Sequence, residues 1–218
     1  MSRRMHENRI PLTMRGHITT GLCALLFLIG LGLALAVLAR PLYVLEIARL
    51  DLQQASGLSE AEILQNYDGL IRWSAPWNRS DFSLATLPSS EGAVVHFHKV
   101  RHLFRLVWLG GAAGGAAMIP LFSRSLRQKE GQRFRVAGKT VLAVPLLIGA
   151  AALIDFSRAF TLFHEIAFPD DYWWFDYRMD PVILLLPESV FLHRFLLILA
   201  TVAAGGATLW LLGRRMDL

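Results

Sequence analysis

The 218-residue chain contains a single cysteine and few charged residues. Cys23 lies inside an apolar run, so an intrachain disulfide, a CxxC redox pair and a cysteine-ligated zinc site are excluded. Charged residues make up only 18% of the chain, whereas hydrophobic residues make up 54% and the mean hydropathy is +0.43. A soluble domain needs more charge than this to cover its core. The composition therefore predicts a membrane protein.

The sequence also lacks the signatures of the common soluble enzymes. No serine stands in a G-x-S-x-G elbow, and there is neither a phosphate-binding P-loop nor a dinucleotide-binding fingerprint. We expect no cofactor. The formal net charge of +5 is compatible with nucleic-acid binding, but the basic residues cluster beside apolar segments, where they orient a protein in a bilayer. We therefore expect no nucleic-acid partner.

Four apolar stretches are long enough to cross a bilayer, which takes about 20 residues. They cover approximately residues 18–39, 103–122, 140–160 and 191–212. The second and fourth contain runs of glycine and alanine, which let helix backbones approach closely. The pattern predicts an all-α membrane protein, residues 1–218 forming a single domain of four transmembrane helices with the small-residue faces inside the bundle.

Basic residues flank these stretches unevenly. They precede the first stretch, join the second to the third, and end the chain: Arg3, Arg4, Arg9, Arg15, Arg124, Arg127, Lys129, Arg133, Arg135, Lys139, Arg214 and Arg215. By the positive-inside rule, both termini are then cytoplasmic. Segments of about residues 40–102 and 161–190 face the extracytoplasmic side, where we expect them to form a small outer cap.

The first apolar stretch has an alternative interpretation as a signal peptide, because Arg15 precedes it and small residues follow. The apolar region of a signal peptide usually has about 7–15 residues, and this stretch is longer, which favours a retained anchor. Cleavage would leave the two long polar segments on the same outer side.

Both outer segments carry local patterns. Ser59-Glu60-Ala61-Glu62 has the polar start of a helix, and the apolar residues that follow it up to Ile71 recur at helical spacing. We expect a short amphipathic helix there. The run Tyr172-Trp173-Trp174-Phe175 is typical of the headgroup layer of a bilayer.

Histidines occur in both outer segments, at His96, His98 and His102 in the first and at His164 in the second. Because a histidine exchanges protons near neutral pH, one from each segment could form a general acid–base pair. His164 could equally be an interfacial histidine bonded to a backbone carbonyl. His98 and His102 share a helix face, as a metal pair would, but a third ligand is missing, and we expect no metal.

Three motifs occupy residues 90–104, 163–171 and 180–188. They read SEGAVVHFHKVRHLF, FHEIAFPDD and DPVILLLPE, and shorter similar stretches are PLY at 41–43 and EILQNY at 62–67. In order and spacing, these motifs resemble the bacterial lipoprotein intramolecular transacylases over most of the chain after the first apolar stretch. One position departs from the family pattern, because Lys99 stands where an acidic residue is usual.

The resemblance implies a four-span enzyme of the bacterial cytoplasmic membrane with its site on the extracytoplasmic side. Such enzymes move the sn-2 acyl chain of a diacylated lipoprotein's diacylglyceryl-cysteine to the α-amino group of the same cysteine, which gives the lyso-form. The family's two essential histidines match His96 and His164. The candidate substrate-binding or supporting residues are Asn66, Tyr67, Asp171, Trp173, Asp180 and Glu188.

The roles of these residues stay open at this level. His164 is the candidate base and His96 the candidate acid, but the assignments could be exchanged, and an acyl-histidine is also possible. Glu188 could orient a histidine or begin a helix, and the aspartates could do either or be solvated. Two alternative functions are a non-enzymatic membrane partner or scaffold, and a metal or haem protein using His98, His102 or His193.

Overall fold

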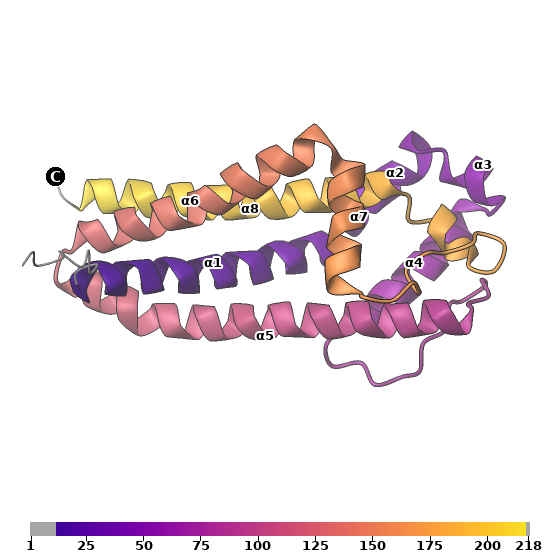
Figure 1. Cartoon of the computed structure of the whole chain (residues 1–218), viewed down its shortest axis with the longest axis horizontal. Helices are drawn as coiled ribbons and strands as arrows, with labels where there is room; N and C mark the ends of the chain where they lie inside the picture. Colours follow the sequence, from indigo (N-terminus) through magenta and orange to yellow (C-terminus); the bar gives the residue numbers. More distant parts are fainter. Residues whose placement is uncertain (1–11, 217–218) are drawn as a thin grey trace, which may run out of the picture.

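The computed structural model describes residues 12–216, and side chains from residue 16 onward. Within these residues the protein is helical without strands, and four helices are long and apolar enough to cross a membrane. They are α1 (Leu12–Leu38), α5 (Glu91–Arg127), α6 (Gly131–Ile154) and α8 (Glu188–Arg215). The four lie side by side along the long axis of the molecule (Figure 1). The predicted class, an all-α membrane protein with four spans, is confirmed.

Shorter helices gather at one end of this bundle (Figure 1). They are α2 (Arg40–Arg49), α3 (Leu52–Ser56), α4 (Glu60–Ser74), α7 (Phe156–Ala167) and a 3₁₀ helix, η1 (Pro181–Leu184). All except α7 form a cap beyond the bundle, whereas α7 runs crosswise to the long helices where the bundle meets the cap. The cap buries its own apolar cluster, which includes Tyr43, Ile47 and Ile63.

Helix α4 is the amphipathic helix that the sequence predicts. The Ser59 hydroxyl accepts a hydrogen bond from the Glu62 N–H at 3.3 Å, and the Glu62 carboxylate accepts one from the Ser59 N–H at 2.9 Å. This reciprocal capping box satisfies two N–H groups that the first turn would otherwise leave unpaired. The buried face of the helix, which includes Ile63, Tyr67 and Leu70, turns toward the cap core.

Helix α5 is much longer than its apolar stretch. Its 37 residues extend over roughly 55 Å at 1.5 Å per residue, whereas the hydrocarbon core of a bilayer is about 30 Å thick. The first turns, which carry the motif at 90–104, therefore project beyond the apolar bundle into the cap.

The third span differs from the expected range of about 140–160. Helix α6 ends at Ile154, and α7 begins at Phe156 in a new direction. The Asp155 carboxylate accepts a hydrogen bond from the Arg158 N–H at 3.0 Å, so it caps the start of α7. Residues 156–160 thus belong to the crosswise helix rather than to the span.

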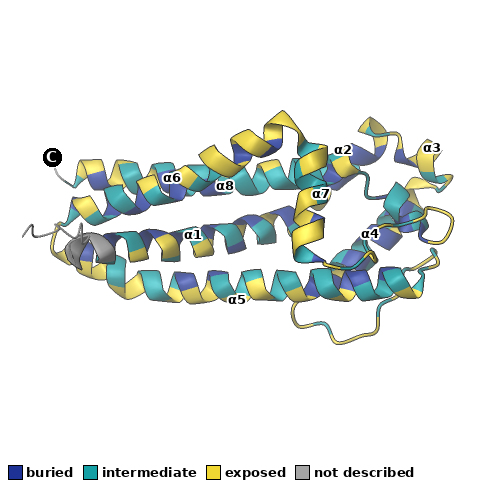
Figure 2. Ribbon diagram, in the orientation of Figure 1, coloured by how far each residue is buried: buried dark blue, intermediate teal, exposed yellow. Residues whose placement is uncertain are grey.

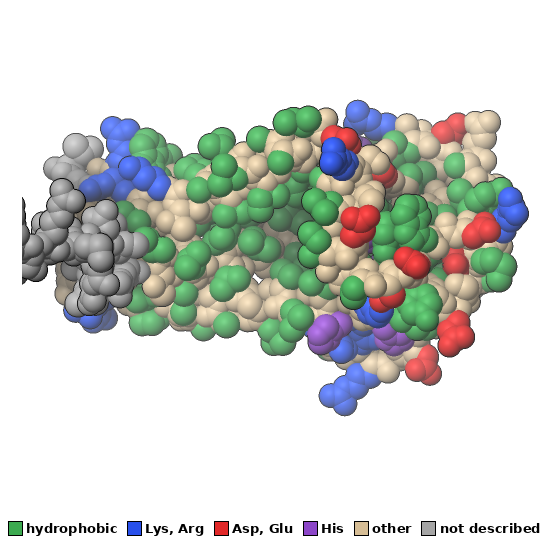
Figure 3. Space-filling view, viewed as in Figure 1, with side chains coloured by type: hydrophobic (Ala, Val, Ile, Leu, Met, Phe, Trp, Pro, Cys, Tyr) green, Lys and Arg blue, Asp and Glu red, His purple; other side chains and the backbone are tan. Residues whose placement is uncertain are grey.

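The outer surface of the bundle is apolar, as expected for a surface that faces lipid. Figure 3 shows hydrophobic side chains over the middle of the bundle, basic side chains at one end, and charges of both signs at the cap. Figure 2 shows exposed residues along the outer sides of α6 and α7, and these include Leu146, Leu147 and Ile166. Exposed leucine and isoleucine at this density fit hydrocarbon rather than water.

Candidate active site

His96 and His164 come together from two helices. His96 lies in the projecting part of α5, His164 lies near the end of α7, and their ring centroids are 6.0 Å apart with an interplanar angle of 26°. Both side chains are buried, with 7% and 9% exposure. The two histidines singled out by their motifs are therefore neighbours.

Asp180 fixes the start of α5, two turns before His96. One oxygen of its carboxylate accepts a hydrogen bond from the Ser90 N–H at 2.7 Å, and the other accepts one from the Ser90 hydroxyl at 2.8 Å. The same hydroxyl caps the helix by accepting from the Ala93 N–H at 3.1 Å. Asp180 is buried, so these bonds hold the first turn of α5 in place against η1.

The His164 ring is held in one tautomer. Its Nδ1 lies 2.8 Å from the Phe160 carbonyl oxygen, which can only accept, so Nδ1 carries the proton and donates. The lone pair of the neutral ring is then on Nε2. Burial lowers the pKa of His164 below its ordinary value of 6.5, although the bond to Phe160 opposes this. At neutral pH His164 is an uncharged ring with a free proton-accepting nitrogen.

His96 has an unpaired nitrogen. Its Nδ1 is buried and has no hydrogen-bond partner within the described part of the chain. A buried polar atom without a partner is unfavourable, by about 1–3 kcal/mol, and native proteins keep few of them. This nitrogen is therefore available for a hydrogen bond to a group that enters the site.

Aromatic rings enclose the pair. Phe168 contacts both histidines, with centroid distances of 4.8 Å to His96 and 5.6 Å to His164. Phe175 lies 5.4 Å from His96, and Trp173 lies 5.0 Å from His164. These rings keep water from the imidazoles and present an apolar wall to a ligand.

Lys99, which departs from the family pattern, forms an ion pair with Asp170. The hydrogen bond from Lys99 lowers the pKa of the Asp170 carboxyl group. A carboxylate thus lies in this region despite the lysine, but it comes from the loop after α7 and is already paired with a cation.

Of the six candidate supporting residues, Trp173 has a ring contact with a histidine, and the contacts described for the other five are with other groups. Asn66 donates to the Glu62 carbonyl and to Thr86, and Tyr67 stacks on Tyr43 at a centroid distance of 3.7 Å. Glu188 accepts from the Ser157 hydroxyl at 3.1 Å, which ties α8 to α7. Asp180 caps α5 as described above. Asp171 is exposed.

Sequence reasoning missed Phe168 and Phe175 as walls of the site, and it missed the Asp170 partner of Lys99. Phe168 could have been found from its place within the motif that contains His164, but nothing in the local sequence reveals a partner 71 positions away. Within residues 12–216, no three histidine, cysteine or carboxylate side chains come together as a possible metal site. His98 lies edge-on to Trp73, at a centroid distance of 5.1 Å.

A groove of about 630 Å³ opens beside the site, between α5 and the end of α7. Phe168, which touches both histidines, forms part of its wall. His98, Lys99 and His102 line its polar part, and Leu103 and Leu106 continue it along α5 toward the apolar bundle. The lining of the groove therefore changes from polar to apolar, as a lipid molecule does from its headgroup to its acyl chains.

The chain is similar to known proteins in sequence and in fold. The family described as lipoprotein intramolecular transacylase Lit has a sequence model that matches residues 18–191. The solved structure of the membrane-integral lipoprotein intramolecular transacylase of Bacillus cereus is similar, with a TM-score of 0.90 and 26% identity over 94% of this chain and 96% of that one. A histidine-to-arginine variant of that enzyme has a TM-score of 0.84 and 25% identity, over 94% of this chain and 92% of the other. No curated relative matches the chain.

Proposed function

Because the chain belongs to the lipoprotein intramolecular transacylase family, we propose that His96 and His164 carry the acyl transfer that this enzyme performs. The single observation that supports this most is their geometry. Two buried imidazoles from different helices lie 6.0 Å apart, one with a free accepting nitrogen and the other with an unpaired one. Family membership does not favour the non-enzymatic partner or the haem protein.

The substrate class is lipoproteins, and we propose that the form used is the diacylated one. Its cysteine carries both reactants, an α-amino group and a diacylglyceryl thioether whose sn-2 ester is the acyl donor. The enzyme then has to bring the amine to the ester carbonyl. Well-oriented intramolecular reactions reach effective molarities of about 10⁵–10⁸ M, so positioning supplies much of the acceleration.

We assign the base to His164. An α-amino group has a pKa of about 7.7–8.0 and is mostly protonated at neutral pH, so it must lose a proton to attack. Nε2 of His164 takes that proton, because Nδ1 is already bonded to Phe160 and burial keeps the ring neutral. The nitrogen then bonds to the ester carbonyl carbon, and the carbonyl oxygen becomes an oxyanion.

His96 is the proposed hydrogen-bond donor and acid. The C–O bond to glycerol breaks as the intermediate collapses, and the departing oxygen takes a proton, which leaves an amide and a free hydroxyl. The nitrogen gives up two protons on its way from the protonated amine to the amide, so we propose that one reaches the departing oxygen through His96 and the other passes from His164 to solvent. The reverse assignment, or an acyl group carried briefly on one histidine, uses the same two residues.

The groove beside the site suits the lipid part of the substrate. Phe168, which contacts both histidines, forms part of its wall, and its apolar residues Leu103 and Leu106 continue it along α5, where Leu106 is exposed. We propose that an acyl chain lies against these leucines while its ester reaches the histidine pair. The site would then work from the extracytoplasmic leaflet of the bacterial cell membrane, with both termini in the cytoplasm.

The test is tandem mass spectrometry of the N-terminal lipopeptide from a lipoprotein in cells that make this protein or a variant. Acyl migration is an isomerisation, so fragments must locate one chain on the cysteine nitrogen. We expect this product with the wild-type enzyme and about 10²–10⁴-fold slower formation with His164→Ala or His96→Ala.

Glu165→Ala is the matched control, since Glu165 neighbours His164 on α7 but is exposed. It should form product at the wild-type rate. Near-normal transfer by His164→Ala, in protein shown to be inserted in the membrane, would remove His164 from the mechanism.

A further inference from the structure

Three nitrogen-bearing side chains follow one face of α5 on the side away from the catalytic pair. Arg101, Arg105 and Trp108 are spaced four and three residues apart, which places them on one helix face. At about 100° per residue, Arg105 points opposite to His96 on the same helix. This surface is therefore separate from the site described above.

These three side chains have donors without acceptors. Nε of Arg101, Nε of Arg105 and Nε1 of Trp108 are each shielded by the protein and have no hydrogen-bond partner among the described residues. Arg101 is only 5% exposed and stacks on the Trp73 ring at 4.6 Å. Arg105 donates from Nη2 to the Asn78 carbonyl at 3.2 Å.

The positive charge of this pair is not compensated. In the described part of the chain, no carboxylate forms an ion pair with Arg101 or Arg105. Like charges four residues apart on a helix repel, and guanidinium groups near hydrocarbon are unfavourable without a partner. An anion at this position would satisfy both the charges and the free donors.

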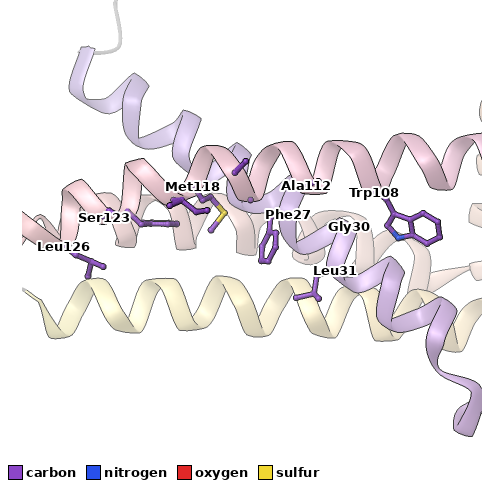
Figure 4. Close-up of a pocket in the computed structure, with 13 residues that line it drawn as sticks. Phe27, Gly30, Leu31, Trp108, Ala112, Met118, Ser123 and Leu126 are labelled. Carbon is purple, nitrogen blue, oxygen red and sulfur yellow. The ribbon is translucent and has the colours of Figure 1, made fainter. Parts of the chain in front are cut away.

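A groove begins at the same point. It has a volume of about 750 Å³, runs between α1 and α5, and is lined by apolar side chains that include Phe27, Leu31 and Ile119 (Figure 4). Trp108 marks its end toward the cap, and Ala112 and Ile119 continue the helix face that carries the arginines. From Trp108 to Ile119, α5 rises roughly 16 Å, about half of a 30 Å hydrocarbon core.

We propose that this groove binds a phosphate-bearing glycerolipid from the leaflet on the cap side. One acyl chain lies along Phe27, Leu31 and Ala112, and the side chains of Arg105 and Trp108 turn to present their shielded donors to the phosphate. Arg101 adds positive charge behind them. Arginine pairs with phosphate through its planar fork of donors, and an indole N–H donates to the same oxygens. The lipid is an addition to the acyl substrate and occupies the opposite side of α5.

The test uses two probes with identical chains, dioleoylphosphatidylglycerol and dioleoylglycerol. Each is titrated into the purified, detergent-solubilised protein, and binding is read by native mass spectrometry. We expect the phosphate-bearing probe to bind roughly tenfold or more tightly, since a charge-assisted hydrogen bond is worth about one order of magnitude. Arg105→Gln should abolish this preference, and Ala112→Trp should weaken the binding of both probes by filling the groove.

Two further variants guard against misfolding and general charge effects. Trp108→Phe keeps an aromatic ring at this position, although a smaller one, removes the N–H, and should weaken phosphatidylglycerol binding severalfold. Arg178→Gln removes an exposed cap arginine and should bind like the wild type. Equal binding of both probes, or wild-type binding by Arg105→Gln, overturns the proposal. So does a site that takes inorganic phosphate but not the lipid.

Discussion

At the scale of single residues, we expect the protonation state of His164, the proposed base, to set the pH range in which the enzyme works. Burial lowers the pKa of His164 below 6.5, so the ring stays neutral, and able to accept a proton, in mildly acidic solution. The neutral ring is the proposed base for the amine of the substrate, whose pKa is about 7.7–8.0. We expect kcat/KM for a synthetic diacylated lipopeptide to fall below an apparent pKa lower than 6.5, where His164 becomes protonated, and not to fall above the amine pKa, where the amine is already the free nucleophile.

The measurement is a pH profile of kcat/KM, which reports the ionisations of free enzyme and free substrate. Glu165→Gln, which removes a neighbouring exposed charge, should leave the shape unchanged. An acid limb with an apparent pKa of 6.5 or above, or a fall in rate above the amine pKa, would contradict a neutral His164 base that deprotonates the amine.

The residues that could be predicted from the sequence are those with a local signal. His96 and His164 stand in compact motifs and could be found in this way, whereas the ion pairs of the outer region depend on the fold. Lys99 pairs with Asp170, and the buried Glu46 contacts His193 at 2.7 Å across 147 positions. Charge pairs of this kind follow from tertiary packing, so no local pattern reveals them.

At the scale of helices, the glycines of α5 differ in what they do. A Cβ added at Gly114 would lie 2.5 Å from the Cys23 carbonyl oxygen on α1, whereas one added at Gly110 would meet nothing within 4 Å. Gly114→Ala should therefore separate α1 from α5 and lower the thermal stability in detergent. Gly110→Ala should be neutral or raise it slightly, because alanine is favoured over glycine in a helix by up to about 1 kcal/mol.

Differential scanning fluorimetry of the two variants beside the wild type is a matched comparison, with the same change on the same helix. Equal melting temperatures for Gly114→Ala and Gly110→Ala would mean that α1 and α5 are not in close contact at Gly114.

Helices differ in how far their sequence predicts them. The cap helix at Glu60–Ser74 carries its own start signal and apolar period, and the structure forms it as expected. The end of α6 carries no clear signal in the hydropathy of the sequence, because apolar residues continue past Asp155 into α7. Contacts with α8 accompany the change of direction at α7: the ring centroids of Phe160 and Phe191 are 5.1 Å apart, and Ser157 donates to Glu188. These contacts put His164 beside α5, and a hydropathy profile does not contain them.

At the scale of the whole molecule, basic residues gather at the end of the bundle away from the cap, and from this we predict which side of the membrane holds the histidines. Arg124 and Arg127 end α5, and Arg214 and Arg215 end α8, all at the end away from the cap. By the positive-inside rule, we predict that this end is cytoplasmic and that the cap is extracytoplasmic. The prediction is tested with single cysteines in a Cys23→Ser background, because Cys23 is the natural thiol.

Trp77→Cys reports on the cap, where Trp77 is 80% exposed, and Gln128→Cys reports on the exposed connection between α5 and α6. In intact cells, or in spheroplasts if an outer membrane is present, a membrane-impermeant maleimide should label Trp77→Cys and leave Gln128→Cys unlabelled, whereas both should react after the membrane is permeabilised. That second labelling is the control for thiol access. The opposite pattern would place His96 and His164 on the cytoplasmic side, where they would not meet a lipoprotein anchored in the outer leaflet, and the proposed direction of substrate entry would be wrong.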